Sequence, residues 1–500
     1  MSHTARLAFA AILAALLSPS GAVAKTMTFG AACKPGERVT IAAVGDLLFH
    51  KSLLRQAFHR RAGFAPFWQP MKAVLADVDI AYANLEGPAA HGVAAGGRRV
   101  RDPGWRIDYR VYGYRLPNLS FNYHPSLLDD LVKSGFDVVS TANNHALDRG
   151  ALGIDRTIEN LKDAGLAFTG TKSRQDVDRP WSVITKAGGV SVAWLACTYS
   201  TNGIPDRASQ VLDCYKQREA VLAEVERLAT DPAVDAVILT PHWGYENSRN
   251  TNAKQRKLAR EVLDAGATAI IGAHPHVLQP WEKHTSPDGR EGLIVYSLGN
   301  FISNQRRTPQ RVGQMALVEL VKSGNGKAQV SAAGYIPTWV SIGRGHRVGP
   351  APARSWAMKH AKRVLPKGNL TSLKSWRKLP RACPKEVPSV TAEAREETKS
   401  NRVPAGPVSL APGPPTPLDE QTEPAAAPDD AARGDPPAKP DGEKIAHAPS
   451  DVDGDAAPRE NVTERAVVRE IRRRPRRRSA KKRPAKPPEP WQPDRPPGAN

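Results

Sequence analysis

Short runs of β-branched and small apolar residues recur through the first two-thirds of the chain, and each run stops abruptly at polar side chains. Six runs share this pattern: 39–44, 78–83, 136–142, 236–240, 267–271 and 293–296. Short apolar runs bounded by turn residues indicate buried strands. Between them, apolar residues recur at helical spacing before a glycine, as in 127–135, 158–165 and 258–266. This alternation of buried strands and glycine-terminated helices predicts an α/β core.

The residues that follow these strands are of types that bind metals. In parallel sheets, ligands collect beyond the carboxyl ends of the strands, so the six ends are expected to converge on one cleft. Taken singly, each residue has an ordinary explanation; Asp46 after Gly45, for example, fits a turn or a helix cap. Three histidines, a carboxylate pair and two asparagines at strand ends are much harder to assign to chance. The spacing of His274 and His276 also predicts that both rings point to the same side, because side chains alternate along a strand.

The first 24 residues have the order of a signal peptide. Arg6 precedes an apolar run over 7–17, and Pro19 and the small residues 22–24 follow it. A short membrane anchor is the alternative, but about ten apolar residues fall short of the roughly 20 that a spanning helix needs. We therefore expect cleavage after Ala24 and a secreted protein in the periplasm or at the cell surface.

The composition changes at about Lys385, where Pro, Ala, Asp and Glu become dominant and about half of the 44 prolines lie. Such a stretch cannot bury enough apolar surface to offset its chain entropy. We therefore predict a disordered Pro-rich tail over 385–500. What remains is one folded unit, with a main domain over 36–345 and a C-terminal extension of that domain over 346–384.

The formal net charge of +21 lies mostly on the predicted folded unit, because acidic and basic residues nearly cancel in the tail. Within the tail, the basic run 472–483 is the exception. Inside a cell it would indicate nucleic-acid binding, but outside the cell the accessible partners are anionic lipids and polymers. No nucleic acid is expected. Binding to an anionic membrane or envelope surface and a merely solvated charge run remain as alternatives.

Four cysteines fit an oxidising compartment, but four cysteines allow three pairings. Cys33 and Cys383 bracket the predicted domain, while Cys197 and Cys214 are close in sequence. These two pairs are favoured, and four unpaired buried thiols remain as the alternative. The cysteine spacing of a zinc-thiolate site is absent.

At the strand ends the chain resembles the CapA-type capsule-synthesis (poly-γ-glutamate) family, a branch of the calcineurin-like metallophosphoesterases. The motifs that carry the resemblance are each weak alone but strong as an ordered set. They are Gly45-Asp46, Asn84-Leu85-Glu86-Gly87-Pro88, the segment 142–148, His242-Trp243-Gly244, His274-Pro275-His276 and Ser297-Leu298-Gly299-Asn300-Phe301. The resemblance implies a calcineurin-like two-sheet α/β sandwich flanked by helices, with two divalent metal ions near the strand ends.

The resemblance also implies a role for each candidate residue. Asp46 and His276 would hold the first metal, Asn144, His242 and His274 the second, and Glu86 with Asn84 would replace a bridging aspartate. His145 would protonate a leaving oxygen or stabilise a developing charge, and Asp148 is assigned to the catalytic group with it. Asn143 and Asn300 would bind substrate. Carboxylate, imidazole and amide ligands together suit manganese, iron or zinc better than calcium.

The chain departs from the wider superfamily at two ligands. That superfamily opens with Asp-x-His, whereas Asp46 is followed by Leu47 and Leu48, so one imidazole is missing. His50 lies two residues further on and is a poor replacement. The first metal site is therefore expected to be weaker or to hold a different ion. Hydrolysis does not follow from the fold alone.

Two functions from different classes fit these observations. The first is a metal-dependent hydrolase or transferase that acts on an anionic envelope substrate, such as a phosphoester or a γ-glutamyl polymer. The second is a non-catalytic accessory protein of capsule polymer synthesis or export that binds the anionic polymer. His145 beside Asn144 favours catalysis.

Overall fold

The structure is a computed structural model that describes residues 26–115, 120–343, 345–381, 383 and 468–470. The predicted signal peptide, the basic run 472–483 and most of the predicted disordered tail lie outside the described residues. Within the described ranges, no helix is long and apolar enough to cross a membrane.

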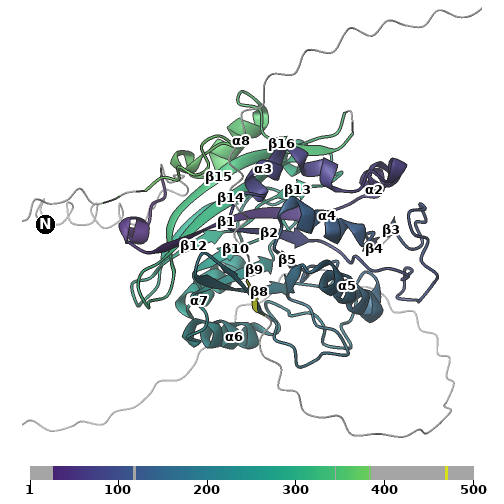
Figure 1. Cartoon of the computed structure of the whole chain (residues 1–500), viewed down its shortest axis with the longest axis horizontal. Coiled ribbons are helices and arrows are strands. Elements are labelled where there is room, and N and C mark those ends of the chain that lie inside the picture. Colours follow the sequence, from purple (N-terminus) through teal and green to yellow (C-terminus); the bar gives the residue numbers. More distant parts are fainter. Residues whose placement is uncertain (1–25, 116–119, 344, 382, 384–467, 471–500) are drawn as a thin grey trace, which may run out of the picture. The chain divides into compact units, whose positions relative to one another are not determined.

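The first of two large β-sheets has the strand order β16-β15-β14-β1-β2-β5-β6, and β13 also pairs with β1 (Figure 1). The neighbours β1, β2, β5 and β6 are parallel, whereas β14, β15 and β16 pair in antiparallel fashion. The strands are β1 (Glu37–Leu47), β2 (Ile80–Leu85), β5 (Val138–Ser140), β6 (Ala167–Thr169), β13 (Asn300–Ile302), β14 (Val312–Lys322), β15 (Gln329–Ser341) and β16 (Arg347–Pro350).

The second sheet has the order β11-β12-β10-β9-β8-β7-β17, with parallel pairs from β8 through β9 and β10 to β12. The strands are β7 (Val183–Ala187), β8 (Val190–Thr198), β9 (Ala236–His242), β10 (Ala269–Ile271), β11 (Trp281–Thr285), β12 (Glu291–Val295) and β17 (Val468–Glu470). Strand β17 falls within the predicted disordered tail and was not expected. It pairs with the outer strand β7, whose outer backbone groups are open to a further strand.

Most of the helices cover the outer faces of the two sheets, whereas the helix over 356–364 packs with the core between them. The α-helices are α2 (Lys51–Phe58), α3 (Lys72–Leu75), α4 (Ser126–Ser134), α5 (Gly150–Ala164), α6 (Arg218–Thr230), α7 (Ala253–Asp264) and α8 (Trp356–Val364). Short elements complete the fold: η3 (Gly30–Cys33), η4 (His59–Arg61), η5 (Ala65–Met71), η6 (Thr308–Arg311), η7 (Lys367–Asn369), β3 (Gly113–Arg115) and β4 (Ser120–Asn122). The predicted stops of α4 and α5 are confirmed, because Gly135 and Gly165 cap them in the left-handed conformation.

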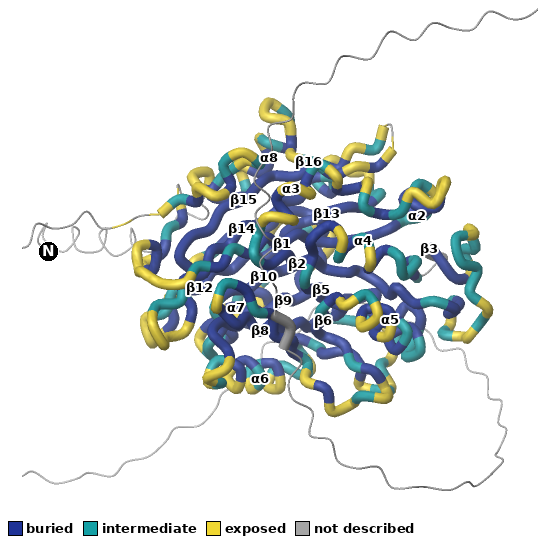
Figure 2. The backbone as a smooth tube through the Cα atoms, in the orientation of Figure 1, coloured by how far each residue is buried: buried dark blue, intermediate teal, exposed yellow. Residues whose placement is uncertain are grey.

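Strand alternation divides the buried side chains into an inner core and two outer cores. Along β1, Ala43 faces the inner core between the sheets, while Val44 faces the core shared with α4 and α5. Along β8, Trp194 faces inward and Leu195 packs with α6 and α7. Tyr82 of β2 stacks on Trp194 across the inner core, with ring centroids 5.3 Å apart. The predicted two-sheet sandwich flanked by helices is confirmed, and Figure 2 shows its strands buried and its outer loops exposed.

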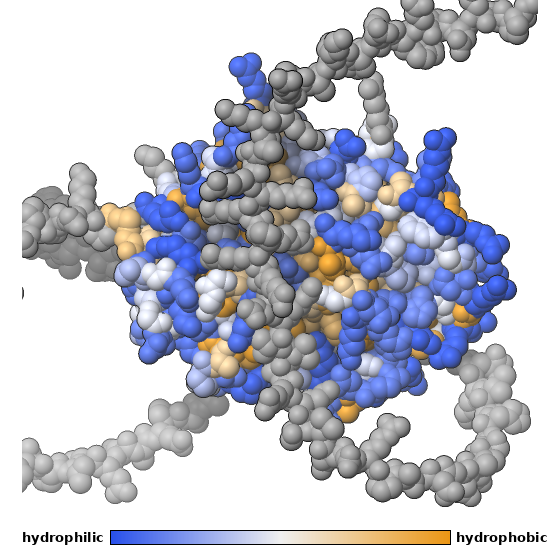
Figure 3. Space-filling model, viewed as in Figure 1, coloured by the Kyte–Doolittle hydropathy of each residue, from blue (hydrophilic) through white to orange (hydrophobic). Residues whose placement is uncertain are grey.

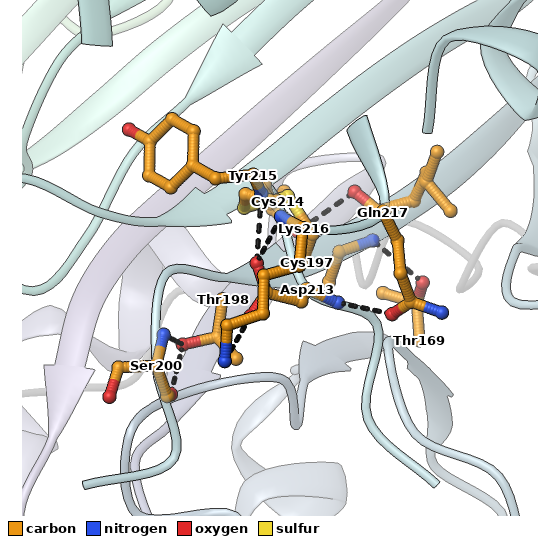
Figure 4. The surroundings of a disulfide bond; sticks show 12 residues. Thr169, Cys197, Thr198, Ser200, Asp213, Cys214, Tyr215, Lys216 and Gln217 are labelled. Carbon is orange, nitrogen blue, oxygen red and sulfur yellow. Dashed lines mark hydrogen bonds and ion pairs between the residues drawn. A yellow bond between two sulfur atoms is a disulfide. The ribbon is translucent and has the colours of Figure 1, made fainter. Parts of the chain in front are cut away.

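Both favoured disulfides are present. Cys33 pairs with Cys383, and Cys197 pairs with Cys214. The first joins η3 to the end of the predicted C-terminal extension, and the second closes the loop that follows β8 (Figure 4). Two structural disulfides indicate folding in an oxidising compartment.

Candidate metal centre

The polar residues predicted at the strand ends meet where the carboxyl ends of parallel strands from both sheets come together. Asp46 and Asn84 are register partners on the parallel strands β1 and β2. His242 is the last residue of β9 in the other sheet, and it forms a bridge with Ala273 beyond β10. The two sheets therefore each supply one side of the cluster.

Short side-chain contacts connect the two sides. Nδ2 of Asn84 donates to Oδ1 of Asp46 at 2.8 Å and lies 3.2 Å from Nδ1 of His242. Nδ1 of His276 lies 3.0 Å from Oδ2 of Asp46. Nε2 of His242 lies 2.9 Å from Oδ1 of Asn144. These contacts connect five of the predicted ligands in one continuous buried network: Asp46, Asn84, Asn144, His242 and His276.

Glu86 lies inside this network with no hydrogen bond to its carboxylate. Its Oε1 is 3.7 Å from Nε2 of His242 and 3.7 Å from Nε2 of His276. Both carboxylate oxygens of Glu86 and Oδ1 of Asn84 are buried without a hydrogen-bond partner among the described residues. Burial raises the pKa of Glu86. Buried polar oxygens without partners are costly, and a cation between them and the imidazoles would satisfy them, so the residues fit a metal.

Two groups of potential ligand atoms share Glu86. Asp46, Glu86 and His276 form one, and Glu86, His242 and His274 form the other, with the ligand atoms of each group within 4.8 Å of one another. Glu86 is therefore common to both groups, and its role as a bridging ligand stays a prediction.

Glu246 joins a third group of potential ligands, with His274 and His276. Glu246 is exposed and lies in the loop after β9. Sequence reasoning missed this residue because it does not directly follow a strand. Its position four residues after His242, behind the His-Trp-Gly motif, is the signal that could have indicated it.

Burial sets the charge of two histidines in the cluster. It lowers the pKa of His242 and of His274 well below the usual value, and the neighbouring histidines add to the effect. Both rings are therefore neutral near pH 7, which is the form that binds a metal. Burial alone would lower the pKa of His276 as well, but the carboxylates of Glu86 and Asp46 raise it to about 10.

His274 and His276 reach the cluster through an unusual backbone. Strand β10 ends at Ile271, and the two histidines have φ angles of 98° and 58°. Neither residue is in a strand. The alternation of side chains along a strand was therefore the wrong explanation for how the two rings are placed. Left-handed conformations at residues other than glycine are strained and concentrate at functional sites.

His145 and Asp148 form a pair beside the cluster. Nδ1 of His145 lies 2.8 Å from Oδ2 of Asp148, and the same oxygen accepts from the backbone N–H of Phe121. Because an ionised carboxylate only accepts, Nδ1 carries the hydrogen of this contact and Nε2 is the other reactive nitrogen. Burial raises the pKa of Asp148, while the hydrogen bond to His145 lowers it.

Asn143 and Asn300 are fully buried. Nδ2 of Asn143 donates to the carbonyl of Leu85 at 2.8 Å, and its Oδ1 accepts from the backbone N–H of His145 at 3.2 Å. Nδ2 of Asn300 donates to Oε1 of Gln305 at 2.7 Å. These contacts hold the loops around the cluster. Substrate binding by Asn143 and Asn300 stays a prediction.

His50 does not replace the missing imidazole. Its Nδ1 lies 3.2 Å from the carbonyl of Leu48 and accepts from the backbone N–H of Asn304 at 3.3 Å. Burial lowers the pKa of His50 to about 4. Among the described residues, His50 belongs to none of the groups of potential metal ligands.

Asn202 is a second residue that sequence reasoning missed. It is exposed and lies in the loop closed by Cys197 and Cys214, between β8 and α6. Its Oδ1 accepts from Nδ2 of Asn144 at 3.1 Å, and its Nδ2 lies 3.4 Å from Nδ1 of His145. An asparagine in a polar loop carries no strand-end signal, so only the folded chain reveals this contact.

Two facing sheets with a buried cluster of carboxylate, imidazole and amide groups at their strand ends define an α/β sandwich with a candidate metal centre. The family model described as "Bacterial capsule synthesis protein PGA_cap" matches residues 40–305. The chain belongs to this family, as the resemblance at the strand ends predicts.

Two relatives are proteins of Bacillus. The chain is 32% identical to "Capsule biosynthesis protein CapA" of Bacillus anthracis over 300 residues, which cover 59% of this chain and 66% of that protein. It is 30% identical to "PGA biosynthesis protein CapA" of Bacillus subtilis (strain 168) over 241 residues, which cover 45% of this chain and 55% of that protein. The match therefore spans somewhat less than two-thirds of one relative and about half of the other.

The solved structure of Haemophilus influenzae NAD nucleotidase (NadN) aligns with 67% of this chain and 57% of its own, at 11% identity and a TM-score of 0.35. A likeness at this level is too low to support an argument about function.

Proposed function

We propose that this protein is a metal-dependent hydrolase or transferase that acts on an anionic cell-envelope or capsule substrate in the periplasm or at the cell surface. One observation carries the proposal. Three buried oxygens, two of Glu86 and one of Asn84, have no hydrogen-bond partner among the described residues, and Oε1 of Glu86 lies 3.7 Å from Nε2 of both His242 and His276. This donor set suits manganese, iron or zinc.

In this proposal the ligand groups would divide between two ions. Asp46 and His276 would hold one, Asn144, His242 and His274 the other, and Glu86 would lie between them. Glu246 would complete the outer side, next to His274 and His276. When bound, two such ions supply an activated water and neutralise the charge of a phosphoryl or carboxyl oxygen.

The remaining chemistry belongs to the chain itself. Asp148 fixes the tautomer of His145 by accepting from Nδ1. Nε2 of His145 is then the nitrogen that protonates a leaving oxygen, which is the step of a general acid. Burial of the pair and of the cluster excludes bulk water from the reacting groups.

The charge of the chain supports an anionic substrate, such as a phosphoester or a γ-glutamyl polymer. The formal net charge is +21. On the face drawn in Figure 3 the described surface is mostly hydrophilic, with small apolar areas towards its middle. The names of the two Bacillus relatives refer to capsule and PGA biosynthesis, which agrees with a polymer as substrate or product.

A non-catalytic accessory protein that binds the anionic polymer is the second candidate. Leu48 favours this candidate, because it occupies the position where the wider superfamily has an imidazole. The relatives' names describe biosynthesis and mention no hydrolysis.

Separating the ligand role from the acid role tests the proposal. His145→Ala is expected to keep the bound metal and to lose about 10²–10⁴ in rate, the usual share of a general acid. His274→Ala is expected to lose metal and rate together. Metal content by inductively coupled plasma mass spectrometry and turnover of an aryl phosphodiester and of poly-γ-glutamate are the measurements.

His284→Ala is the control, because His284 pairs with Asp264 at the surface. Equal turnover by His145→Ala and the metal-loaded parent would show that the acid assignment is wrong. A parent protein that binds no transition metal would remove the metal centre, and polymer binding would become the better function.

A further inference from the structure

The loop between β8 and α6 is anchored next to the candidate metal centre at its base. Cys197 and Cys214 close it covalently, and Thr198 exchanges backbone hydrogen bonds with Leu212 and Cys214 at 2.9 and 2.8 Å. Figure 4 shows this base, with Thr198 and Asp213 beside the disulfide. The base of the loop therefore cannot open without breaking a covalent bond and two backbone hydrogen bonds.

The same loop contacts the metal-binding side of the cluster. The backbone N–H of Tyr199 donates to the carbonyl of His242 at 3.0 Å. The ring of Tyr199 packs on His274, with centroids 4.5 Å apart. From this anchored start the chain turns at Asn202, whose φ is 53° and whose N–H donates to Oγ of Ser200 at 3.1 Å. Asparagine is among the few residues that adopt this left-handed conformation readily.

The turn presents the amide of Asn202 to the amide of Asn144. The Asn144 side chain has an oxygen and an NH₂ group of nearly equal size, and only the oxygen can bind a cation. Oδ1 of Asn202 can only accept, so it selects the NH₂ group of Asn144 at 3.1 Å. Oδ1 of Asn144 is thereby turned towards the cluster, where it lies 2.9 Å from Nε2 of His242. With Asn202 in its observed orientation, a flipped Asn144 amide would place two oxygens against each other.

The side chain of Asn202 also lies near His145, but it does not form a hydrogen bond with that ring. Nδ1 of His145 lies 3.4 Å from Nδ2 of Asn202 but 2.8 Å from Oδ2 of Asp148. Because the nitrogen donates to the carboxylate, it cannot also accept from the amide of Asn202. The directed hydrogen bond of Asn202 is therefore the one to Asn144.

We propose that Asn202 is a positioning residue, which fixes the oxygen of Asn144 towards the metal centre and is itself held in place by the Cys197–Cys214 loop. This inference rests on the metal centre of the proposed function, and it does not depend on which reaction that centre performs. Neighbours that orient a metal ligand typically contribute 10–100-fold to metal affinity, by a rough general estimate.

Metal titration by isothermal calorimetry tests the proposal with Mn²⁺ and with Zn²⁺. Asn202→Ala is expected to weaken binding by about tenfold, because the Asn144 amide loses the partner that sets its orientation. Asn202→Asp keeps an acceptor oxygen at the same place and is expected to retain or raise the affinity. Arg207→Ala, at an exposed position of the same loop, is the control and is expected to bind as the parent does.

A catalytic readout separates positioning from substrate contact. If Asn202 acts through the metal, the rate lost in Asn202→Ala returns at saturating metal, because the site is then filled. A rate that stays low at full occupancy would overturn the positioning role. Unchanged affinity in Asn202→Ala would overturn it as well, and would leave the hydrolase proposal intact. If the parent binds metal but turns over no substrate, only the proposed enzymatic function is wrong. If the parent binds no metal, both the enzymatic function and the positioning role of Asn202 are wrong.

The two disulfides provide a matched pair for the role of the loop. Replacing Cys197 and Cys214 by alanine is expected to weaken metal binding in the same direction as Asn202→Ala. Replacing Cys33 and Cys383 by alanine is expected to lower the Tm without changing the affinity of the folded protein. Parent-like affinity in a folded variant without the Cys197–Cys214 bond would overturn the role of the closed loop. If that variant does not fold, Asn202→Ala decides the question alone.

Discussion

Glu86 is a buried carboxylate that the protein does not satisfy with its own donors. Burial raises its pKa, and both oxygens are without a hydrogen-bond partner in the described part of the chain. Such a group destabilises the metal-free fold, whereas a bound cation compensates it. Glu86→Gln is therefore expected to raise the Tm in EDTA and to lower it relative to the parent in the presence of Mn²⁺.

Glu319→Gln is the matched control for thermal unfolding. Glu319 has partners on both oxygens, with Arg38 at 2.7 Å and Arg381 at 2.5 Å. Its replacement is expected to lower the Tm with or without metal, because the two guanidinium groups lose a charged acceptor. If Glu86→Gln in EDTA has a lower Tm than the parent, Glu86 stabilises the metal-free protein, and the prediction that it is a metal ligand is contradicted.

His360 of α8 predicts a dependence of stability on pH. Its ring stacks on Trp356, and neither ring nitrogen has a hydrogen-bond partner within the described residues. Burial, together with Arg249 and Arg363, lowers its pKa from 6.5 to about 4. Because the unfolded chain takes up the proton first, the contribution of His360 to stability is complete above pH 6.5 and is lost as the pH falls towards 4.

His360→Phe keeps the stacking and removes this titration. The free energy of unfolding of the variant is expected to fall less steeply between pH 6.5 and 4, by up to about 1.4 kcal/mol per pH unit for one proton. Denaturant titrations at pH 8, 6, 5 and 4.5 measure the two slopes. Other buried histidines titrate equally in both proteins, so parallel curves would show that His360 is not the group responsible.

At this scale the sequence indicated candidate metal ligands but not their surroundings. Asp46, Glu86 and His242 were predicted because metal-binding residue types directly follow strands. Asn202 and Glu246 lie in loops, where a polar residue is ordinary and only the folded chain gives it a partner. The backbone of His274 was likewise not predicted, because a φ of 98° is uncommon for a histidine and no turn residue in the local sequence indicates it.

Among the elements, β1 depends on a single glycine to bring Asp46 into place. A Cβ at Gly45 would lie 1.8 Å from the carbonyl oxygen of Gly299, and the pairing of β1 shifts register just there. Gly45→Ala is therefore expected to displace Asp46, to lower metal affinity and to lower the Tm by several degrees. Metal titration and thermal unfolding are the measurements.

Gly343→Ala is the matched substitution, since a Cβ there would meet nothing within 4 Å. It is expected to behave as the parent does. Gly45→Ala with parent-like metal affinity would show that β1 can separate from Gly299 without moving the ligand.

The sequence indicated which segments are strands better than it indicated their neighbours. Strands β1 and β10 have the same apolar pattern, yet they belong to different sheets. The antiparallel part formed by β14, β15 and β16 was not predicted either, because strand pairing depends on contacts between segments far apart in sequence. The division into two sheets came from the family resemblance.

For the whole molecule, the predicted tail is expected to be dispensable for the fold. A chain that ends after Cys383 retains both disulfides and, of the contacts between described residues, loses the three-residue pairing of β17 with β7. Its Tm and metal affinity are expected to match those of the full chain, and limited proteolysis of the full chain should give a fragment of that size. A protease-resistant fragment that contains residues 400–460 would contradict this.

A second truncation, which ends after Leu379, is the control for the first. It removes Cys383 and also Arg381, which pairs with Glu319 at 2.5 Å. Loss of a native disulfide typically costs about 2–5 kcal/mol, so this variant is expected to unfold at a clearly lower temperature. Equal stability of the two truncations would show that the long-range bond contributes nothing.

The basic run 472–483 predicts attachment to anionic surfaces, although it lies outside the described residues. The full chain is expected to sediment with vesicles that contain phosphatidylglycerol at low salt. Binding should weaken steeply above roughly 0.1 M salt, where the screening length falls to about 10 Å. Replacement of the basic run by Ser and Gly should abolish sedimentation, and unchanged sedimentation would return it to a solvated charge run.

The two disulfides also differ in when they can close as the chain is made. The partners in one bond are 17 residues apart, and those in the other are 350 apart. At synthesis rates of about 5–20 residues per second, Cys383 follows Cys33 by roughly 20–70 s. Until Cys383 is present, the only other cysteines of the chain with which Cys33 can pair are Cys197 and Cys214. Early closure of the shorter bond removes both of these wrong partners, so the bond that anchors the loop beside the metal centre also protects the correct pairing of the ends.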